Sequence, residues 1–261
     1  MNSEMQNYPW LCIFVKMYLI ILIPPSSSMN FFKSSEPVLR RKQHELDVQD
    51  LRGIWRIHWK IGNFTLWNAI YTRIDQVFLL WGVLTATIFL TAQFSPFDWG
   101  VQAVFWSFLT VIGTVGMLAL SWSWVVAERA VWLVVCWMAL MGIGLFLTDY
   151  SIFYGWGEVM LNLGPLWLGL TAIGYLITGF GLRSRALAYA GIFHLLSGLV
   201  LLSVSDWQFL STGMVMAGSL LLLGESQWDM RSPIDYNLSE VEKEFNRLQH
   251  QVRQTALQRN H

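Results

Sequence analysis

His194 is the residue whose type and position most directly suggest chemistry. It lies near the middle of the apolar stretch 186–203 and is the single histidine of residues 77–223. An ionisable side chain at membrane depth is a candidate for function, and an imidazole can ligate a haem iron or a pigment magnesium. Gly191 and Gly198 share its helical face, so one alternative is a close helix contact across which the imidazole hydrogen-bonds. Proton transfer is a third alternative.

Two polar residues near the start of the stretch 159–182 form a second candidate site. Glu158 and Asn162 are one helical turn apart, on one face, and they precede Pro165. They predict a polar outer site that opens towards a cavity, as a small-solute transporter or channel would need. The alternative is structural, because a glutamate near a helix N-terminus is favoured by the helix dipole.

Glu128 and Arg129 lie at the opposite, inner boundary of the membrane region. Neighbouring residues point about 100° apart on a helix, so we expect the two side chains not to pair with each other. Both can reach headgroups or water, and we assign them a structural role.

The sequence lacks the motifs of the common enzyme classes. It has no phosphate-binding lysine loop, no zinc His-Glu pair, no G-x-S-x-G turn and no closely spaced cysteine pair, since Cys12 and Cys136 are far apart. We therefore expect a non-enzymatic protein with no metal site and no cofactor. The net charge of zero gives no indication of a nucleic-acid partner.

Composition indicates that the elements around these residues lie in a membrane. The chain has 261 residues, of which 54% are hydrophobic and 13% charged, against about 25% charged residues in a soluble domain. Uninterrupted apolar stretches of this length predict helices that cross a bilayer. We expect six spans, at residues 77–94, 101–121, 125–147, 159–182, 186–203 and 209–223.

The distribution of charge predicts how these spans are oriented. Basic residues fall in the tails and in the turns on one side, and the turns on the other side are acidic. Since Lys and Arg mark the cytoplasmic face, both termini are expected to be cytoplasmic. Each outer turn pairs an acid with an aromatic residue, which predicts three helical hairpins with Asp capping the next helix. The residue pairs in the three outer turns are Asp98-Trp99, Asp149-Tyr150 and Asp206-Trp207. The alternatives to helix capping are a threefold internal repeat and a ring of carboxylates that collects cations.

The N-terminal region divides into two parts. Residues 1–28 contain an apolar run that is too short to span a bilayer, and we interpret them as an extension that precedes a true start at Met29. An interfacial segment and a signal peptide are the alternatives. Residues 30–76 form a basic cytoplasmic tail. We expect an amphipathic helix there that lies in the membrane interface. The alternative is a helix folded under the bundle. The apolar face of the expected helix holds Leu51, Ile54, Trp55, His58 and Ile61.

The C-terminal tail, 225–261, predicts a helix with a capping box formed by Ser239 and Glu242. Apolar residues then recur at spacings of four and three, as in a short coiled coil. This pattern favours contact with a protein partner or a second copy of the chain, and packing onto the bundle or the membrane is the alternative. The predicted contact residues are Val241, Phe245, Leu248 and Val252.

The sequence as a whole predicts an all-α, polytopic six-helix transmembrane bundle within 77–223. Six spans in three hairpins, with the glycine-rich stretch 174–181, resemble the architecture of small acid-resistance membrane proteins of the HdeD type. We expect a scaffold, assembly or stress-related membrane factor that acts through its cytoplasmic tails. The alternatives are the small-solute transporter or channel and a pigment- or haem-binding protein that uses His194.

Overall fold

The computed structural model describes residue 32 and residues 37–42, 46–61, 64–203, 206–231 and 238–259. The chain divides into two units, Met1–Phe31 and Phe32–His261, and every described residue belongs to the second. The predicted extension 1–28 and the predicted start at Met29 lie outside the described residues.

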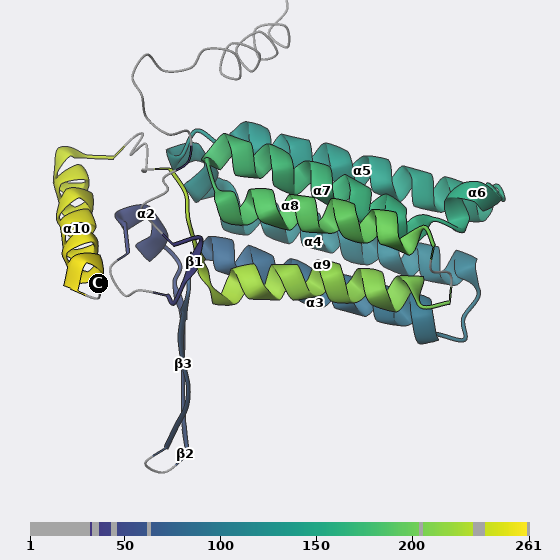
Figure 1. Ribbon diagram of the computed structural model, residues 1–261, viewed down its shortest axis with the longest axis horizontal. Helices are drawn as coiled ribbons and strands as arrows, with labels where there is room; N and C mark the ends of the chain where they lie inside the picture. The colour runs from purple at the N-terminus through teal and green to yellow at the C-terminus, as the bar shows by residue number, and fades with distance from the viewer. Residues whose placement is uncertain are drawn as a thin grey trace, which may run out of the picture. The chain divides into compact units, whose positions relative to one another are not determined.

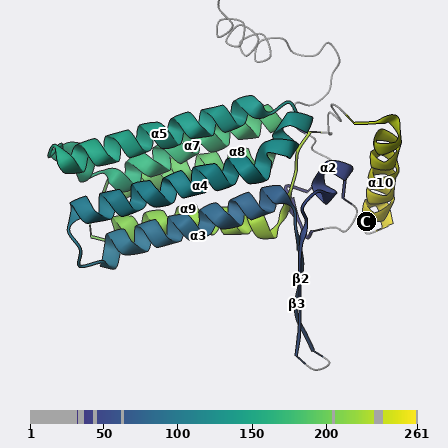
Figure 2. The same ribbon diagram turned by 180° about the vertical axis from the view of Figure 1, so that it is seen from behind.

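A bundle of antiparallel helices forms the centre of this unit (Figures 1 and 2). Four of its helices are long and apolar enough to cross a membrane, as the composition predicted. Two shorter helices pack beside them. The long helices are α3 (Arg73–Phe94), α4 (Trp99–Ala127), α5 (Val131–Phe153) and α7 (Leu163–Leu182), and the shorter ones are α8 (Arg185–Leu201) and α9 (Gln208–Glu225). These helices are called the bundle below.

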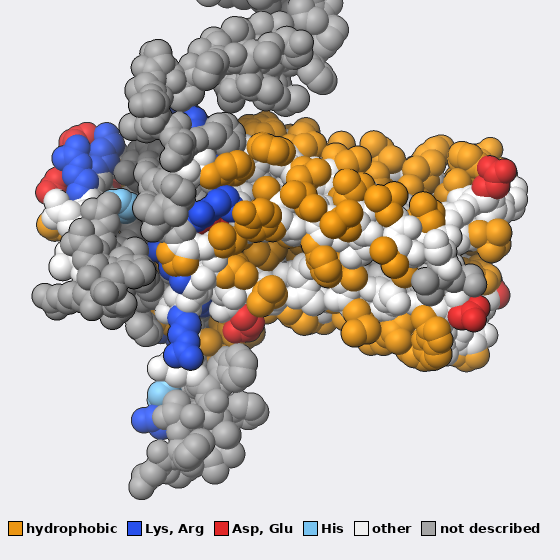
Figure 3. Space-filling model, in the orientation of Figure 1, with side chains coloured by type: hydrophobic (Ala, Val, Ile, Leu, Met, Phe, Trp, Pro, Cys, Tyr) orange, Lys and Arg blue, Asp and Glu red, His pale blue; other side chains and the backbone are white. Residues whose placement is uncertain are grey.

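The two ends of the bundle differ. The tail end carries the described residues that precede α3 and follow α9, and the loop end carries the short helix α6 (Gly157–Met160) between α5 and α7 (Figure 1). Hydrophobic side chains cover the visible face of the bundle between these ends (Figure 3). Phe146, on the surface of α5, is 65% exposed and Met214, on α9, is 70% exposed. An apolar surface of this extent is suited to lipid contact.

Small residues allow two close helix pairs, one of them at Gly191, where a close helix contact was an alternative for the face of His194. A side chain at Gly191 of α8 would come within 3.0 Å of the Ala172 carbonyl oxygen of α7. One at Gly213 of α9 would come within 2.7 Å of Phe89 on α3. These close pairs, α7 with α8 and α3 with α9, join helices from different predicted hairpins, so the hairpins do not pack as independent units.

Several predicted boundaries are wrong. The third span was expected over 125–147, but α4 continues to Ala127 and α5 begins at Val131. Arg129 has a φ of 50° and makes the turn between them. The fourth span was expected over 159–182, but α6 ends at Met160 and α7 begins at Leu163. Proline is tolerated in the first turn of a helix, where Pro165 lies, because those N–H groups have no intrahelical partner.

The amphipathic helix expected around Trp55 is also wrong, because this segment forms a β-hairpin. Strands β2 (Trp55–Ile61) and β3 (Phe64–Tyr71) pair antiparallel, with Trp55 opposite Tyr71. Apolar and polar residues alternate strictly along β2, and a period of two is the signature of a strand. The interfacial location predicted for this segment stays a prediction.

The remaining elements connect the tails to the bundle. Strand β1 (Leu39–Arg40) pairs antiparallel with β4 (Gln227–Trp228), which follows α9. A four-residue helix, α2 (Val48–Leu51), precedes the hairpin. The predicted C-terminal helix is present as α10 (Glu240–Arg259). The N-terminal and C-terminal tails therefore meet at the tail end.

Candidate functional site

A cavity of about 180 Å³ lies inside the bundle and is lined by residues from all of its helices. Its walls are apolar and aromatic, with few polar groups. Two tryptophans of the wall are fixed by hydrogen bonds between helices: Trp137 Nε1 of α5 donates to Thr178 Oγ1 of α7 at 3.0 Å, and Trp167 Nε1 of α7 donates to Thr148 Oγ1 of α5 at 3.2 Å. Such bonds hold the walls in place without a ligand.

His194 is fully buried at the wall of this cavity. Its Nδ1 lies 2.7 Å from the carbonyl oxygen of Ala190, one turn earlier on α8. A carbonyl oxygen can only accept, so Nδ1 carries the proton and Nε2 of the neutral ring is a bare acceptor. The imidazole ring lies against Tyr175 of α7, with ring centroids 4.9 Å apart. Nε2 finds no hydrogen-bond partner among the described residues.

The structure bears on two of the three predictions about His194, and proton transfer stays a prediction. The close contact of α8 with α7 at Gly191 agrees with the packing alternative. The imidazole bonds within its own helix instead of across the contact. A bare Nε2 suits a metal ligand, but a cavity of about 180 Å³ is well below the roughly 300–1,000 Å³ of pockets for larger ligands. The pigment or haem assignment stays a prediction.

The second predicted site lies at the loop end and is open to solvent. Glu158 and Asn162 are both exposed, on either side of the break between α6 and α7. The Asn162 amide donates to the Glu158 carbonyl oxygen at 2.8 Å, so it bridges the break. Asp149, which the prediction placed in the same outer turn as Glu158, lies instead within α5 and accepts from Ser107 Oγ of α4 at 2.9 Å. Asp149 and Ser107 line the cavity inside the bundle, whereas Glu158 and Asn162 are not among its lining residues.

A polar cluster at the tail end was not predicted. Asp229, just after β4, is 3% exposed and accepts from the backbone N–H groups of Arg185 and Ala186 at 3.1 and 3.0 Å. It also accepts from Arg185 Nε at 2.7 Å. Asp229 therefore caps α8 from a segment that follows α9, and it neutralises a basic residue at the turn between α7 and α8.

A second buried pair lies beside it. Glu128 is completely buried in the turn between α4 and α5, and its carboxylate lies 3.4 Å from Arg231 Nη2. The same nitrogen donates to the Glu128 carbonyl oxygen at 2.8 Å. Burial lowers the pKa of the Arg231 guanidinium, while Glu128 opposes this shift. The prediction that Glu128 reaches headgroups or water is therefore wrong, because its carboxylate lies inside the protein and pairs with a residue that is distant in the sequence.

Helix α10 presents two different faces. Its polar face holds α2, since Asn246 Oδ1 accepts from Val48 N at 2.8 Å and Glu242 lies 3.3 Å from Arg52 Nη2. Its apolar stripe, the predicted contact residues, stays exposed. The exposed fractions are 81% for Val241, 36% for Phe245, 53% for Leu248 and 52% for Val252.

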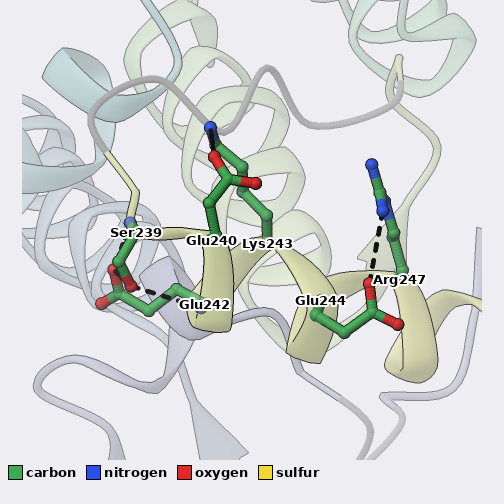
Figure 4. Close-up of polar contacts among 6 residues, drawn as sticks. All are labelled: Ser239, Glu240, Glu242, Lys243, Glu244 and Arg247. Carbon is green, nitrogen blue, oxygen red and sulfur yellow. Dashed lines mark hydrogen bonds and ion pairs between the residues drawn. The ribbon is translucent and has the colours of Figure 1, made fainter.

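Local contacts explain why α10 is helical (Figure 4). Glu242 accepts from Ser239 N at 2.8 Å and Ser239 Oγ accepts from Glu242 N at 3.3 Å, which is the predicted capping box. Hydrogen bonds from Ser239 lower the pKa of the Glu242 carboxyl. Lys243 and Arg247 each pair with a glutamate three residues earlier.

No protein-family profile, curated protein or solved structure matches this chain. Within the described residues, no three His, Cys, Asp or Glu side chains come close enough together to hold a metal ion.

Proposed function

We propose that the whole bundle crosses the bilayer, six times in all, with both tails on the cytoplasmic side. Helices α8 and α9 have 17 and 18 residues, about 26 and 27 Å at 1.5 Å per residue, which is close to the roughly 30 Å of a bilayer core. The charges at the two ends support this orientation under the positive-inside rule. The tail-end turns contain Arg129, Arg183 and Arg185, and the loop end carries Asp98, Glu158 and Asp206.

We propose further that the protein is a non-enzymatic membrane scaffold that self-associates through α10. The exposed apolar stripe of α10 is the observation that carries this proposal. A free amphipathic helix would turn its apolar side onto its own protein, but here the polar side makes that contact. The apolar stripe is left available for a partner.

The stripe fits another helix better than a membrane surface. Its spacings of four, three and four residues form a narrow seam, which is the pattern of a coiled coil. Helices that lie on membranes have a wide apolar face and a basic polar face. The polar face of α10 mixes both charges in the ion pairs of Figure 4.

A second copy of the chain is the partner we propose. Two copies in one membrane share the same orientation, so their α10 helices lie on the same side and meet at equal depth. A seam of this kind is self-complementary, and a twofold contact uses the same patch on both copies. Dimers of this kind would gather two bundles and their cytoplasmic tails into one assembly.

The oligomeric state of the full chain in detergent tests this proposal. In a variant with Leu248→Gln and Val252→Gln, the seam is polar but the helix propensity is kept, because glutamine is a good helix former. We expect native mass measurement to show a dimer for the unaltered chain and a monomer for this variant. The matched control is Glu240→Gln with Lys243→Gln, which removes an ion pair away from the seam and should leave the dimer intact.

Two outcomes would contradict the proposal. An unaltered chain that remains a monomer across the accessible concentration range has no such contact. A dimer that survives the Leu248 and Val252 substitutions is held by another surface, such as the bundle.

A further inference from the structure

We propose that the bundle cavity is a binding site for a small phenol, whose hydroxyl group donates a hydrogen bond to His194 Nε2. The cavity and the bare nitrogen are independent observations that point to one ligand class. Neither depends on the proposed contact through α10.

The polar part of the argument starts from the imidazole. The Ala190 carbonyl oxygen fixes the proton on Nδ1, so Nε2 is the acceptor of this ring, and it is buried without a donor at the wall of the cavity. A buried acceptor without a donor costs about 1–3 kcal/mol, and native proteins leave few of them. Two threonines of the cavity wall, Thr171 and Thr178, do not supply the donor, because each donates to a carbonyl oxygen of its own helix at 2.7 Å.

The size and lining of the cavity select the rest of the ligand. A dry apolar cavity of about 150 Å³ holds one benzene ring, and this cavity is about 180 Å³. The volume that remains beyond one benzene ring accommodates a single polar substituent on that ring. The wall presents the rings of Trp137, Trp167 and Tyr175, which suit edge or stacking contacts with an aromatic ligand.

The hydroxyl group is the discriminating feature. A ring that carries only acceptor oxygens would place a lone pair against the lone pair of Nε2. A phenol places its proton there, and an O–H to nitrogen bond replaces an unsatisfied acceptor. Phenol and its methyl ether, anisole, have nearly the same ring but differ in this one donor, so they form a matched pair of probes.

The test is equilibrium binding of phenol and anisole to the purified full chain in detergent, with protein-free micelles as the correction for partitioning. We expect phenol to bind about ten-fold more tightly than anisole, which is the effect of about 1.4 kcal/mol for one satisfied buried acceptor. In His194→Phe the ring shape is largely kept and the two probes should bind equally. His58→Phe, at an exposed position on β2, is the control and should keep the preference.

A second measurement needs no variant. In the unaltered protein with ¹⁵N-labelled histidine, phenol should shift the resonance of an unprotonated buried Nε2, and anisole should not. Equal binding of the two probes by the unaltered chain, no binding of either, or an unmoved Nε2 resonance at saturating phenol would each overturn the proposal. A preference for phenol that persists in His194→Phe would also overturn it, because the donor would then be recognised elsewhere.

Discussion

The cap that Asp229 places on α8 gives the sharpest prediction about stability. Replacing Asp229 by alanine removes the acceptor of two backbone N–H groups and the carboxylate that pairs with Arg185, whose side chain is 17% exposed. Loss of a helix cap costs about 1 kcal/mol, and breaking a buried ion pair from one side costs about 3–5 kcal/mol. Because Arg185 can partly reach water, we expect a loss of about 3–4 kcal/mol in the free energy of unfolding.

The assay is equilibrium unfolding of the purified chain in micelles, followed by tryptophan fluorescence. Asp98→Ala is the matched control, since Asp98 caps α4 through exposed hydrogen bonds and its loss should cost only about 1 kcal/mol. A double-mutant cycle of Asp229→Ala with Arg185→Ala should give a coupling energy of about 1–3 kcal/mol. The reasoning is refuted if Asp229→Ala costs no more than Asp98→Ala, or if the cycle shows no coupling.

Two further predictions concern the helices themselves. Gly179→Ala should strongly lower the thermal midpoint, because the new Cβ would lie 2.7 Å from the backbone nitrogen of Ala188, whereas Gly169→Ala has no atom within 4 Å and should not lower it. The pKa of the Glu242 carboxyl is lowered, so the ionised carboxylate stabilises α10 at pH values above the ordinary glutamate pKa of 4.5. This stabilisation is lost as the pH falls below that value. The ¹³C shifts of the first turn should show this fraying, and Glu242→Gln should remove its pH dependence; an unchanged pH profile would contradict the role of the cap.

The apolar helices were predictable because their signal is local. In a bilayer, a continuous apolar run long enough to span it can satisfy its backbone hydrogen bonds by forming a helix. The capping box at Ser239 is also a local signal, because its two residues lie within four positions of each other. The hairpin was also visible locally. The residues from Trp55 to Ile61 also place several apolar side chains at helical spacing, but only the period of two fits every residue of β2.

The tail-end cluster could not be predicted in the same way. Glu128 and Arg231 are separated by more than 100 positions along the chain, as the hydrogen bond between them shows. Nothing in the sequence near Asp229 indicates that it caps α8. Such pairs depend on which helices are neighbours, and the bundle brings α9 and its following strand beside the turns at the tail end.

The sidedness of Asp206 tests the central claim of six crossings most directly. Single cysteines at Asp98, Asp206 and Glu240, in a chain with Cys12 and Cys136 replaced by serine, would be treated with a membrane-impermeant maleimide in sealed vesicles whose cytoplasmic face is outward. We predict labelling of the cysteine at position 240 and protection of those at positions 98 and 206 until detergent is added. Labelling at 206 in sealed vesicles, with 98 protected, would mean that α8 and α9 do not cross the bilayer.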